Sequence, residues 1–401
     1  MAKEWIACTY KNVPWQQQMR AGTREDRMVK SIRACFPPEI SKRKFALDSE
    51  LISISEEAIG AIANLDNAHG RTLESLDRLL IRTESIASSK IENLQATTAE
   101  YARAMYGNKS NSSATAMAAG TEALTTLIDS IVPGSEFREN AIKKAHRTLM
   151  KNEPREVETA GKYRQVQNWI EGSDHSPRGA IFIPPPPKEV EELMKDLLAF
   201  ANRDDMPSLI QAAIAHAQFE TIHPFTDGNG RVGRALVNAI LRRRRITTRV
   251  VVPLTSFLVV DRAAYFDDLT QYRDGSLSNL VKRFARAAKV ASRESTLTAN
   301  NLEKLPQIWR KKIGTTRTGS ATSLLLDRLI SQPVFSAEEL IGDISYNSTS
   351  IYNAISKLSG SGIISSLTDR KRDQIWGAVD VLQEVDDLSK RIENEARREP
   401  I

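Results

Sequence analysis

The twelve residues 223–234, His-Pro-Phe-Thr-Asp-Gly-Asn-Gly-Arg-Val-Gly-Arg, constrain this chain more than any other stretch. Three glycines, an asparagine and an aspartate lie here between two apolar runs with helical spacing. This composition predicts a tight turn whose backbone can approach a ligand closely. The run 232–241 predicts a helix that begins in the loop, so its first turn exposes unpaired N–H groups and the positive end of a helix dipole. The loop therefore predicts a binding site for an anion.

The charged side chains of the loop indicate which anion it suits. Arg231 and Arg234 are three residues apart and share one helix face, where two guanidinium groups fit a polyphosphate. Asp227 is the candidate Mg²⁺ ligand, because phosphate-bound Mg²⁺ is usually held by one or two carboxylates. His223, which Pro224 places at the end of the preceding helix, is the candidate general base. Each residue taken alone also fits a capped helix end, a turn or a solvated arginine.

The loop resembles the pattern His-Pro-Phe-x-Asp/Glu-Gly-Asn-Gly-Arg-x-x-Arg of the Fic family of protein adenylyltransferases, matching all nine fixed positions. The resemblance implies that ATP and Mg²⁺ bind here, and that AMP is transferred to a Ser, Thr or Tyr hydroxyl of a target protein or of the protein itself. It implies His223 as the base, Asp227 as the Mg²⁺ ligand, and Arg231 with Arg234 on the β- and γ-phosphates. The other ATP-binding residues that it implies are Gly228, Asn229, Gly230 and Tyr265, although Tyr265-Phe266 stands where the family commonly has two tyrosines.

A second stretch, Ser88 to Asn93, ends an apolar helical pattern that starts near residue 73. By itself it reads as an ordinary helix end with polar residues. Beside the loop, Ser88, Glu92 and Asn93 resemble the Ser/Thr-x-x-x-Glu-Gly/Asn motif of the inhibitory helix that precedes many Fic cores. The resemblance implies autoinhibition, in which Glu92 occupies the guanidinium of Arg234 in place of the γ-phosphate.

Two short extended runs, 167–171 and 180–183, flank Gly172-Ser173-Asp174 and predict a β-hairpin. The hairpin could be incidental on a helical body. Its place resembles the Fic flap, which pairs by backbone hydrogen bonds with the target segment that carries the acceptor hydroxyl. Ile170 and Ile181 are the candidate target-binding residues.

The expected fold is mostly α: a Fic-type helical bundle with a β-hairpin flap, plus a C-terminal winged helix-turn-helix domain. The expected domains are an N-terminal helical region with the inhibitory helix (1–110), a catalytic core (111–313) and a winged helix (321–401) after the polar linker 314–320. Residues 1–45 are expected to be irregular, 277–312 to form two helices, and the wing to turn at 369–372. The charged tail 393–401 is expected to fray.

The composition of the chain indicates its cellular location and the classes of partner that it could have. The 401 residues carry a net charge of +6 and only two cysteines, and no apolar run approaches the ~20 residues of a membrane span. A cytoplasmic protein without a membrane partner is expected. DNA bound through the winged helix and a homodimer are left open as partners. The alternative function is a nucleotide-sensing, DNA-binding transcriptional regulator with a Fic body.

Overall fold

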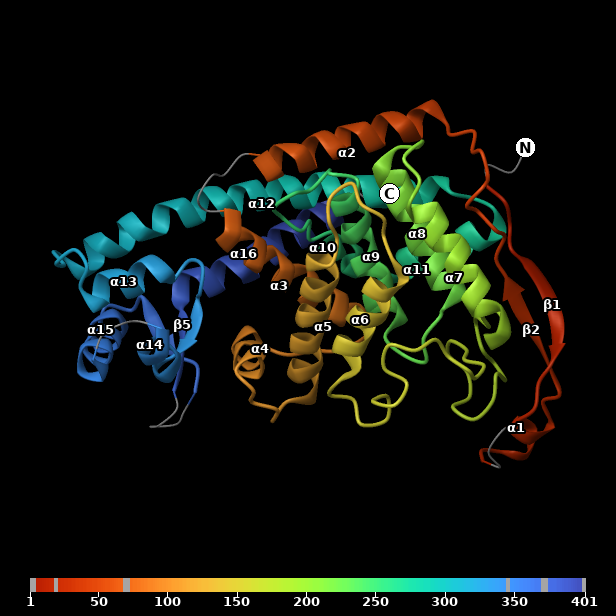
Figure 1. The fold of residues 1–401 in the computed structure, drawn as a ribbon, viewed down its shortest axis with the longest axis horizontal. Coiled ribbons are helices and arrows are strands. Elements are labelled where there is room, and N and C mark those ends of the chain that lie inside the picture. The colour runs from red at the N-terminus through yellow and green to blue at the C-terminus, as the bar shows by residue number, and fades with distance from the viewer. Residues whose placement is uncertain (1–4, 18–20, 68–72, 344–346, 369–373, 399–401) are drawn as a thin grey trace.

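A computed structural model of the chain describes residues 5–17, 21–67, 73–343, 347–368 and 374–398. The molecule is elongated, with a small C-terminal domain at one end and a two-stranded ribbon at the other (Figure 1). Between them lies a helical body along which α12 (Ser278–Ile313) and α2 (Ser49–Asn67) run side by side. Within the described residues no helix is both long and apolar enough to cross a membrane.

The body is built around α8 (Ser208–Ile222), whose residues are all buried. Its apolar run leaves almost no polar face, so the helix has neighbours on every side. It packs against α9 (Asn229–Arg243), α7 (Pro187–Ala201), α2, α11 (Arg262–Asp274) and α12. The remaining body helices are α3 (Leu73–Ile91), α4 (Thr98–Met105), α5 (Ser112–Asp129), α6 (Glu139–Met150) and α10 (Thr255–Leu258), which a short 3₁₀ turn, η2 (Val259–Asp261), joins to α11. The helix that the sequence predicts to end at His223 is confirmed.

The N-terminal segment differs from the irregular chain that the sequence predicts. Strands β1 (Thr9–Pro14) and β2 (Ser31–Phe36) form an antiparallel ribbon, with Thr9 opposite Phe36 and the short helix α1 (Arg24–Met28) between them. The side chains of β1 are mostly exposed, so this strand has no apolar alternation by which a sequence pattern could reveal it. Backbone pairing and the buried face of β2 define the ribbon instead.

A second difference is α12, which is one helix of 36 residues where two were expected. Pro306 lies inside it and removes one backbone donor, a change that usually kinks or breaks a helix. Leu302 and Trp309, on either side of the proline, are fully buried. Their burial holds the two parts in a single helix.

The C-terminal domain contains α13 (Ala321–Arg328), β3 (Val334–Ser336), α14 (Ala337–Asp343), α15 (Ser348–Gly360), β4 (Ile364–Ser366) and β5 (Ile375–Ala378). Its strands form one antiparallel sheet in the order β3-β5-β4. This element order is compatible with the expected winged helix, and the assignment stays a prediction. The expected turn of the wing, 369–372, lies outside the described residues.

The expected fraying from residue 393 is wrong for the described residues, which continue as a helix to Arg398; residues 399–401 lie outside the described part of the chain. The helix α16 (Val379–Arg398) follows β5 directly and buries Val381, Val385, Leu388 and Ile392. It packs back on α12, α10 and α3, and Asp380 at its start accepts a hydrogen bond from Trp309 Nε1 at 2.7 Å. The i, i+4 and i, i+3 spacing of its apolar residues explains why the segment is an ordered helix.

Candidate active site

The candidate base, His223, ends α8 in a left-handed backbone conformation with φ 50° and ψ 61°. Its N–H donates to Phe219 O at 2.8 Å, as expected for a residue that closes a helix. This conformation costs a non-glycine residue ~1–2 kcal/mol, so the surrounding contacts must hold it.

The His223 imidazole is neutral at neutral pH. Burial, with Arg164 as the next cause, lowers the pKa of His223 to about 4, although the Glu220 backbone and the Glu92 carboxylate act in the opposite direction. Its buried Nδ1 atom makes no hydrogen bond within the described part of the chain. Nε2 is therefore the nitrogen left to take a proton from a substrate hydroxyl.

Loop residues hold the turn after His223 in shape. The Asn229 side chain accepts from Phe225 N and donates to Phe225 O, both at 2.8 Å. The His146 ring stacks on Phe225 with centroids 3.8 Å apart and contacts Asp227 O through Nε2 at 3.0 Å, while its Nδ1 accepts from Gly161 N at 2.8 Å. The amide of Asn229 thus faces the loop backbone, so its expected role in ATP binding stays a prediction.

Arg234, the second loop arginine, is buried and already paired. Its Nη2 donates to Glu92 Oε1 at 2.7 Å and to Ser88 O at 3.0 Å, and its Nε donates to Ser88 Oγ at 2.9 Å. Burial alone would lower the pKa of Arg234, but Glu92 raises it above its ordinary value. Burial would likewise raise the pKa of Glu92, but Arg234 holds it below its ordinary value. Both groups are therefore charged, and the contact that the resemblance implies is present.

The surroundings of Glu92 explain why one motif has glycine at position 230 and the other has asparagine at position 93. A Cβ atom added to Gly230 would lie 2.2 Å from Glu92 Oε1, so the carboxylate reaches the first turn of α9 only because this residue is glycine. Asn93 adopts φ 61°, a conformation that asparagine tolerates better than most residues. Its Oδ1 accepts from Arg262 Nη1 at 2.6 Å, which fixes the turn just after Glu92.

Two buried acids near Arg234 were not singled out from the sequence. Burial raises the pKa of Glu84 and of Glu220 to about 7 each. Glu84 accepts from both the backbone N–H and the hydroxyl of Thr255, whereas Glu220 Oε1 has no partner among the described residues. Glu220 is the only charged residue of α8, and this was the available signal for it in the sequence. Arg234 therefore lies in a markedly acidic surrounding.

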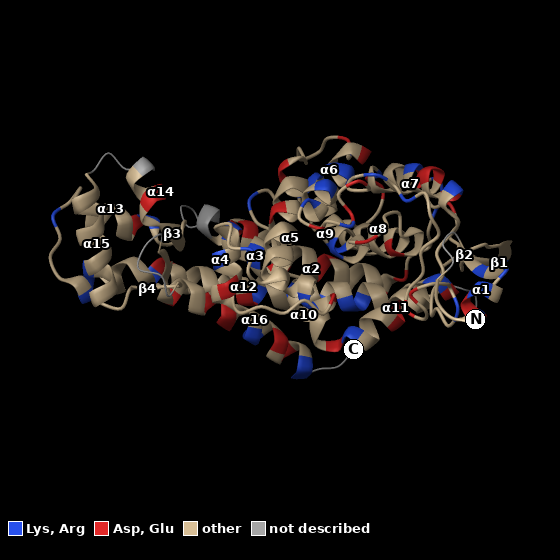
Figure 2. Cartoon of the chain, turned by 90° about the horizontal axis from the view of Figure 1, so that it is seen from below, with Lys and Arg blue, Asp and Glu red and all other residues tan. Residues whose placement is uncertain are grey.

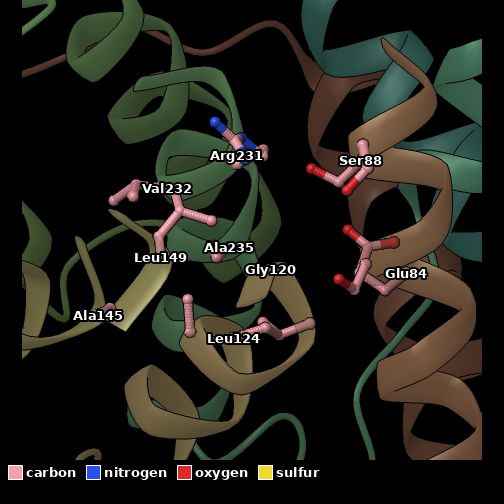
Figure 3. A pocket seen from close by; sticks show the side chains of 12 residues that line it. Glu84, Ser88, Gly120, Leu124, Ala145, Leu149, Arg231, Val232 and Ala235 are labelled. Carbon is pink, nitrogen blue, oxygen red and sulfur yellow. The ribbon is translucent and has the colours of Figure 1, made fainter. Parts of the chain in front are cut away.

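Figure 3 shows how α3 faces this site. Glu84 and Ser88 lie on α3 opposite Arg231, Val232 and Ala235 of α9. The space between them holds a cavity of ≈ 20 Å³, room for about one water molecule. The helix that leads to the inhibitory segment is thus packed closely on α9 at this point.

The candidate metal ligand, Asp227, is the exposed acid of the loop. Its Oδ1 accepts from Gly228 N at 2.6 Å, its Oδ2 lies 3.7 Å from Arg231 Nη2, and 62% of its side-chain surface is exposed. The described residues contain no group of three or more His, Cys, Asp or Glu side chains that could hold a metal by themselves. One accessible carboxylate fits a Mg²⁺ ion whose other ligands are phosphate oxygens and water.

Tyr265 does not offer its ring to a ligand in this structure. The side chain is fully buried, and its hydroxyl lies 2.7 Å from His216 Nε2. Its neighbour Phe266 exposes 44% of its surface. The placement of Tyr265 against adenine stays a prediction that this geometry does not favour.

The predicted flap is present as a single bridge between Ile170 and Phe182, not as two regular strands. Ile170 N donates to Phe182 O at 2.9 Å and Ile181 N donates to Ile170 O at 3.0 Å. Ile181 exposes 69% of its surface and is free for contact, whereas Ile170 packs inward against Phe182. Ile181 is the better placed of the two candidate target-binding residues.

The comparisons with known proteins agree with this site. The model of the Fic/DOC family matches residues 136–241, which include the loop and α8. Protein adenylyltransferase Fic of Nematostella vectensis is 33% identical over 133 residues, covering 32% of this chain and 28% of that protein. A probable protein adenylyltransferase of Aquifex aeolicus is 34% identical over 113 residues, 28% of this chain and 32% of that protein. The chain thus spans about a third or less of the length of these curated relatives.

A crystal structure of a Fic family protein from Desulfovibrio desulfuricans shares the fold, with a TM-score of 0.53 and 21% identity over 83% of this chain and 97% of that one. The helical body and the loop between α8 and α9 define a Fic domain. Residues 136–241 of this chain therefore match the Fic/DOC family.

Proposed function

We propose that this protein transfers AMP from ATP to a hydroxyl side chain of a target protein, itself included. The observation that carries the proposal is the loop: a neutral imidazole at the end of α8, beside a helix N-terminus that bears Arg231 and Arg234. Two relatives named as adenylyltransferases support the same activity.

In this proposal His223 acts on the acceptor. Its imidazole takes the hydroxyl proton while the oxygen forms a bond to the α-phosphorus of ATP, and the bond from that phosphorus to the bridging oxygen breaks to release diphosphate. The N–H groups at the start of α9 and the guanidinium groups of Arg231 and Arg234 would bind the phosphates and offset the charge that develops. Asp227 would hold Mg²⁺, which supplies further charge neutralisation on the phosphates.

The structure as it stands would be the inhibited state of this enzyme. Glu92 occupies the guanidinium that a γ-phosphate would need, at a distance of 2.7 Å. A nucleotide bound against that carboxylate would meet like charge and would be held in a pose unsuited to in-line attack.

The alternative of a DNA-binding nucleotide sensor has less support. The helix α15, which would enter a groove of DNA, has Lys357 as its only charged residue. Figure 2 shows acidic and basic residues interspersed along α12 and α16. DNA binding and a homodimer stay predictions.

Intact-mass measurement after incubation with Mg²⁺ and each of the four ribonucleoside triphosphates tests the proposal. The mass of one AMP should be added with ATP, more readily in Glu92→Gly. Asp227→Asn should lower this Mg²⁺-dependent transfer roughly tenfold or more, because the ion loses its only side-chain ligand in the loop, whereas Asp129→Asn on the exposed surface of α5 should leave it unchanged. An unmodified mass with all four nucleotides, for both wild type and Glu92→Gly, would contradict the proposal.

A further inference from the structure

Arg164 is a buried arginine that makes no ion pair with any described residue. Its side chain is 2% exposed, and burial alone lowers its pKa to about 10. Such a cation is costly to bury unless its donors are satisfied. What satisfies it is a set of backbone carbonyl groups around the candidate base and the flap.

The guanidinium of Arg164 joins three separate pieces of chain. Nε donates to His223 O at 2.8 Å, and Nη2 donates to Pro185 O at 2.6 Å and to Ile222 O at 3.4 Å. Nη1 donates to Val166 O at 3.1 Å. One rigid fork therefore holds the end of α8, the segment that follows the flap and the segment that precedes it.

The backbone of Arg164 strengthens the same junction. Its N–H donates to Pro224 O at 2.9 Å, so Arg164 binds the carbonyl groups on both sides of the His223–Pro224 bond. His223 is the residue that must stay in the left-handed conformation. The carbonyl bonds restrain its ψ angle directly and thereby the direction in which its imidazole leaves the backbone.

We propose that Arg164 is a positioning residue for His223, which fixes the left-handed end of α8 and couples it to the flap. The proposal rests on the proposed role of His223 as the base. A planar guanidinium can donate to four carbonyl groups at once, whereas the ammonium of lysine is a compact donor on a flexible stem. A lysine at position 164 would keep the positive charge but lose the planar fork, so we expect that it could not hold His223 in place.

Steady-state kinetics of Arg164→Lys in the Glu92→Gly background test this role. We expect kcat to fall roughly 10- to 100-fold, since a misplacement of about 1 Å can cost this much, while KM for ATP changes little. The matched control is Arg203→Lys, because Arg203 also donates to three carbonyl groups, those of Ile40, Ser41 and Arg43, far from the loop. It should lower thermal stability without a selective loss of kcat.

The pH profile separates positioning from general damage. Arg164, Arg273 and Glu92 are the charged groups that act on the pKa of His223, and Arg164 lowers it. Arg164→Met removes this charge, so the acid limb of kcat, expected near pH 4, should move to higher pH, whereas Arg164→Lys should leave it in place. Equal losses in kcat, ATP affinity and melting temperature, with no movement of the limb in Arg164→Met, would overturn the proposal. Inactive Glu92→Gly protein would instead count against the proposed function.

A different set of contacts links the inhibitory segment to the C-terminal domain, residues 321–378. Glu92 lies in the connection 92–97 between α3 and α4. On α3, Arg78 Nη1 donates to Ser331 O at 3.4 Å, and Lys90 Nζ lies 3.9 Å from Glu393 Oε1 of α16. Figure 1 shows α4 between the helical body and this domain.

The contacts of α4 and of the residue after it are stronger. The Tyr106 hydroxyl bonds to Val334 O of β3 and, at 2.9 Å, to Glu339 Oε2 of α14. Arg103 Nη1 donates to Leu367 O at 2.7 Å.

The next contacts extend this junction to α16. The Thr98 hydroxyl donates to Asp386 Oδ1 of α16 at 2.6 Å, and α16 follows β5 with no intervening residue. Ala102 packs with Val334 and Ile375 in a small apolar cluster of its own. The helices before and after Glu92 are therefore both attached to the C-terminal domain or to the helix that leaves it.

We infer that the C-terminal domain restrains the inhibitory segment, so that a shift of this domain reaches the Glu92–Arg234 contact through α4 and α16. The inference rests on the proposed function and adds a regulator to the same site. Residues 92–97 connect Glu92 along the chain to α4, which contacts the domain, and a physical connection of this kind is the requirement for coupling between two sites.

The variant Tyr106→Phe/Arg103→Gln removes the polar contacts of α4 with the domain. We expect faster hydrogen exchange in residues 85–93 and roughly fivefold more AMP transfer, the lower end of typical coupling between sites. In the Glu92→Gly background the same pair of changes should add nothing, because both act through one contact. The control is Tyr101→Phe, whose hydroxyl lies on the same helix but bonds to Thr121 of α5 at 2.8 Å.

The exchange measurement needs no catalysis, so it tests the coupling even if the protein transfers no AMP. Transfer absent from Glu92→Gly would contradict the proposed function alone. Unchanged exchange in residues 85–93 of the double variant would overturn the coupling. So would equal stimulation by Tyr106→Phe/Arg103→Gln with and without Glu92.

Discussion

Replacement of His223 by alanine is expected to lower AMP transfer by roughly 10² to 10⁴, the usual contribution of a general base. ATP affinity should change little, because the groups that would bind the phosphates lie on the other side of the loop, at the start of α9. In the proposed role the imidazole acts only as the hydroxyl proton leaves, so its loss should affect the transition state and not nucleotide binding. The measurements are incorporation of labelled AMP and ATP binding by calorimetry, both in the Glu92→Gly background.

His175→Ala is the matched control for this variant, since His175 is an exposed histidine on the flap loop. It should retain transfer. An equal loss of ATP affinity and of rate in His223→Ala would show that His223 holds the loop in shape and is not the base. Full ATP affinity with low transfer, in a folded His223→Ala protein, would instead agree with the proposed role.

The parts of this site that the sequence could predict are those specified by neighbouring residues in the chain. The loop carries its own turn chemistry in three glycines, and the apolar run before it specifies a buried helix, so both were predictable. The contact of Glu92 with Arg234 joins residues 142 apart. No pattern within either segment predicts that contact, and only the resemblance of both motifs to one family connected them.

The features that the sequence did not predict depend mostly on polar or backbone contacts between distant parts of the chain. The Arg164 side chain binds carbonyl groups up to 59 positions away, and a carbonyl group has no sequence identity that a pattern could reveal. The ribbon β1–β2 has an exposed strand without alternation. Residues 393–401 were predicted to fray because of their charges, but those up to Arg398 continue a helix whose preceding apolar residues keep helical spacing. For this helix the apolar stripe predicts the structure better than the charges do, because packing on α12 stabilises it.

The largest expected gain in activity comes from Glu92→Gly. The change removes the carboxylate that lies 2.7 Å from Arg234, while Ser88 still accepts from Arg234 Nε at 2.9 Å and keeps the guanidinium aimed at the site. AMP incorporation should rise roughly tenfold or more, which corresponds to ~1.4 kcal/mol of barrier. A glycine near a helix end costs ~1 kcal/mol at most, so the fold should survive.

Two further variants separate charge from shape at this position. Glu92→Gln keeps the side-chain size and an acceptor for Arg234 but removes the negative charge, so its activation should fall between those of wild type and Glu92→Gly. Arg234→Ala added to Glu92→Gly should cancel the gain, because the two residues act through one contact and their effects cannot be additive. Labelled-ATP transfer by the wild type, the single variants and the double variant gives this cycle. Unchanged AMP transfer in a folded Glu92→Gly protein would contradict autoinhibition. Freeing Arg234 would then have no effect on the rate, and residues 88–93 would be an ordinary helix end.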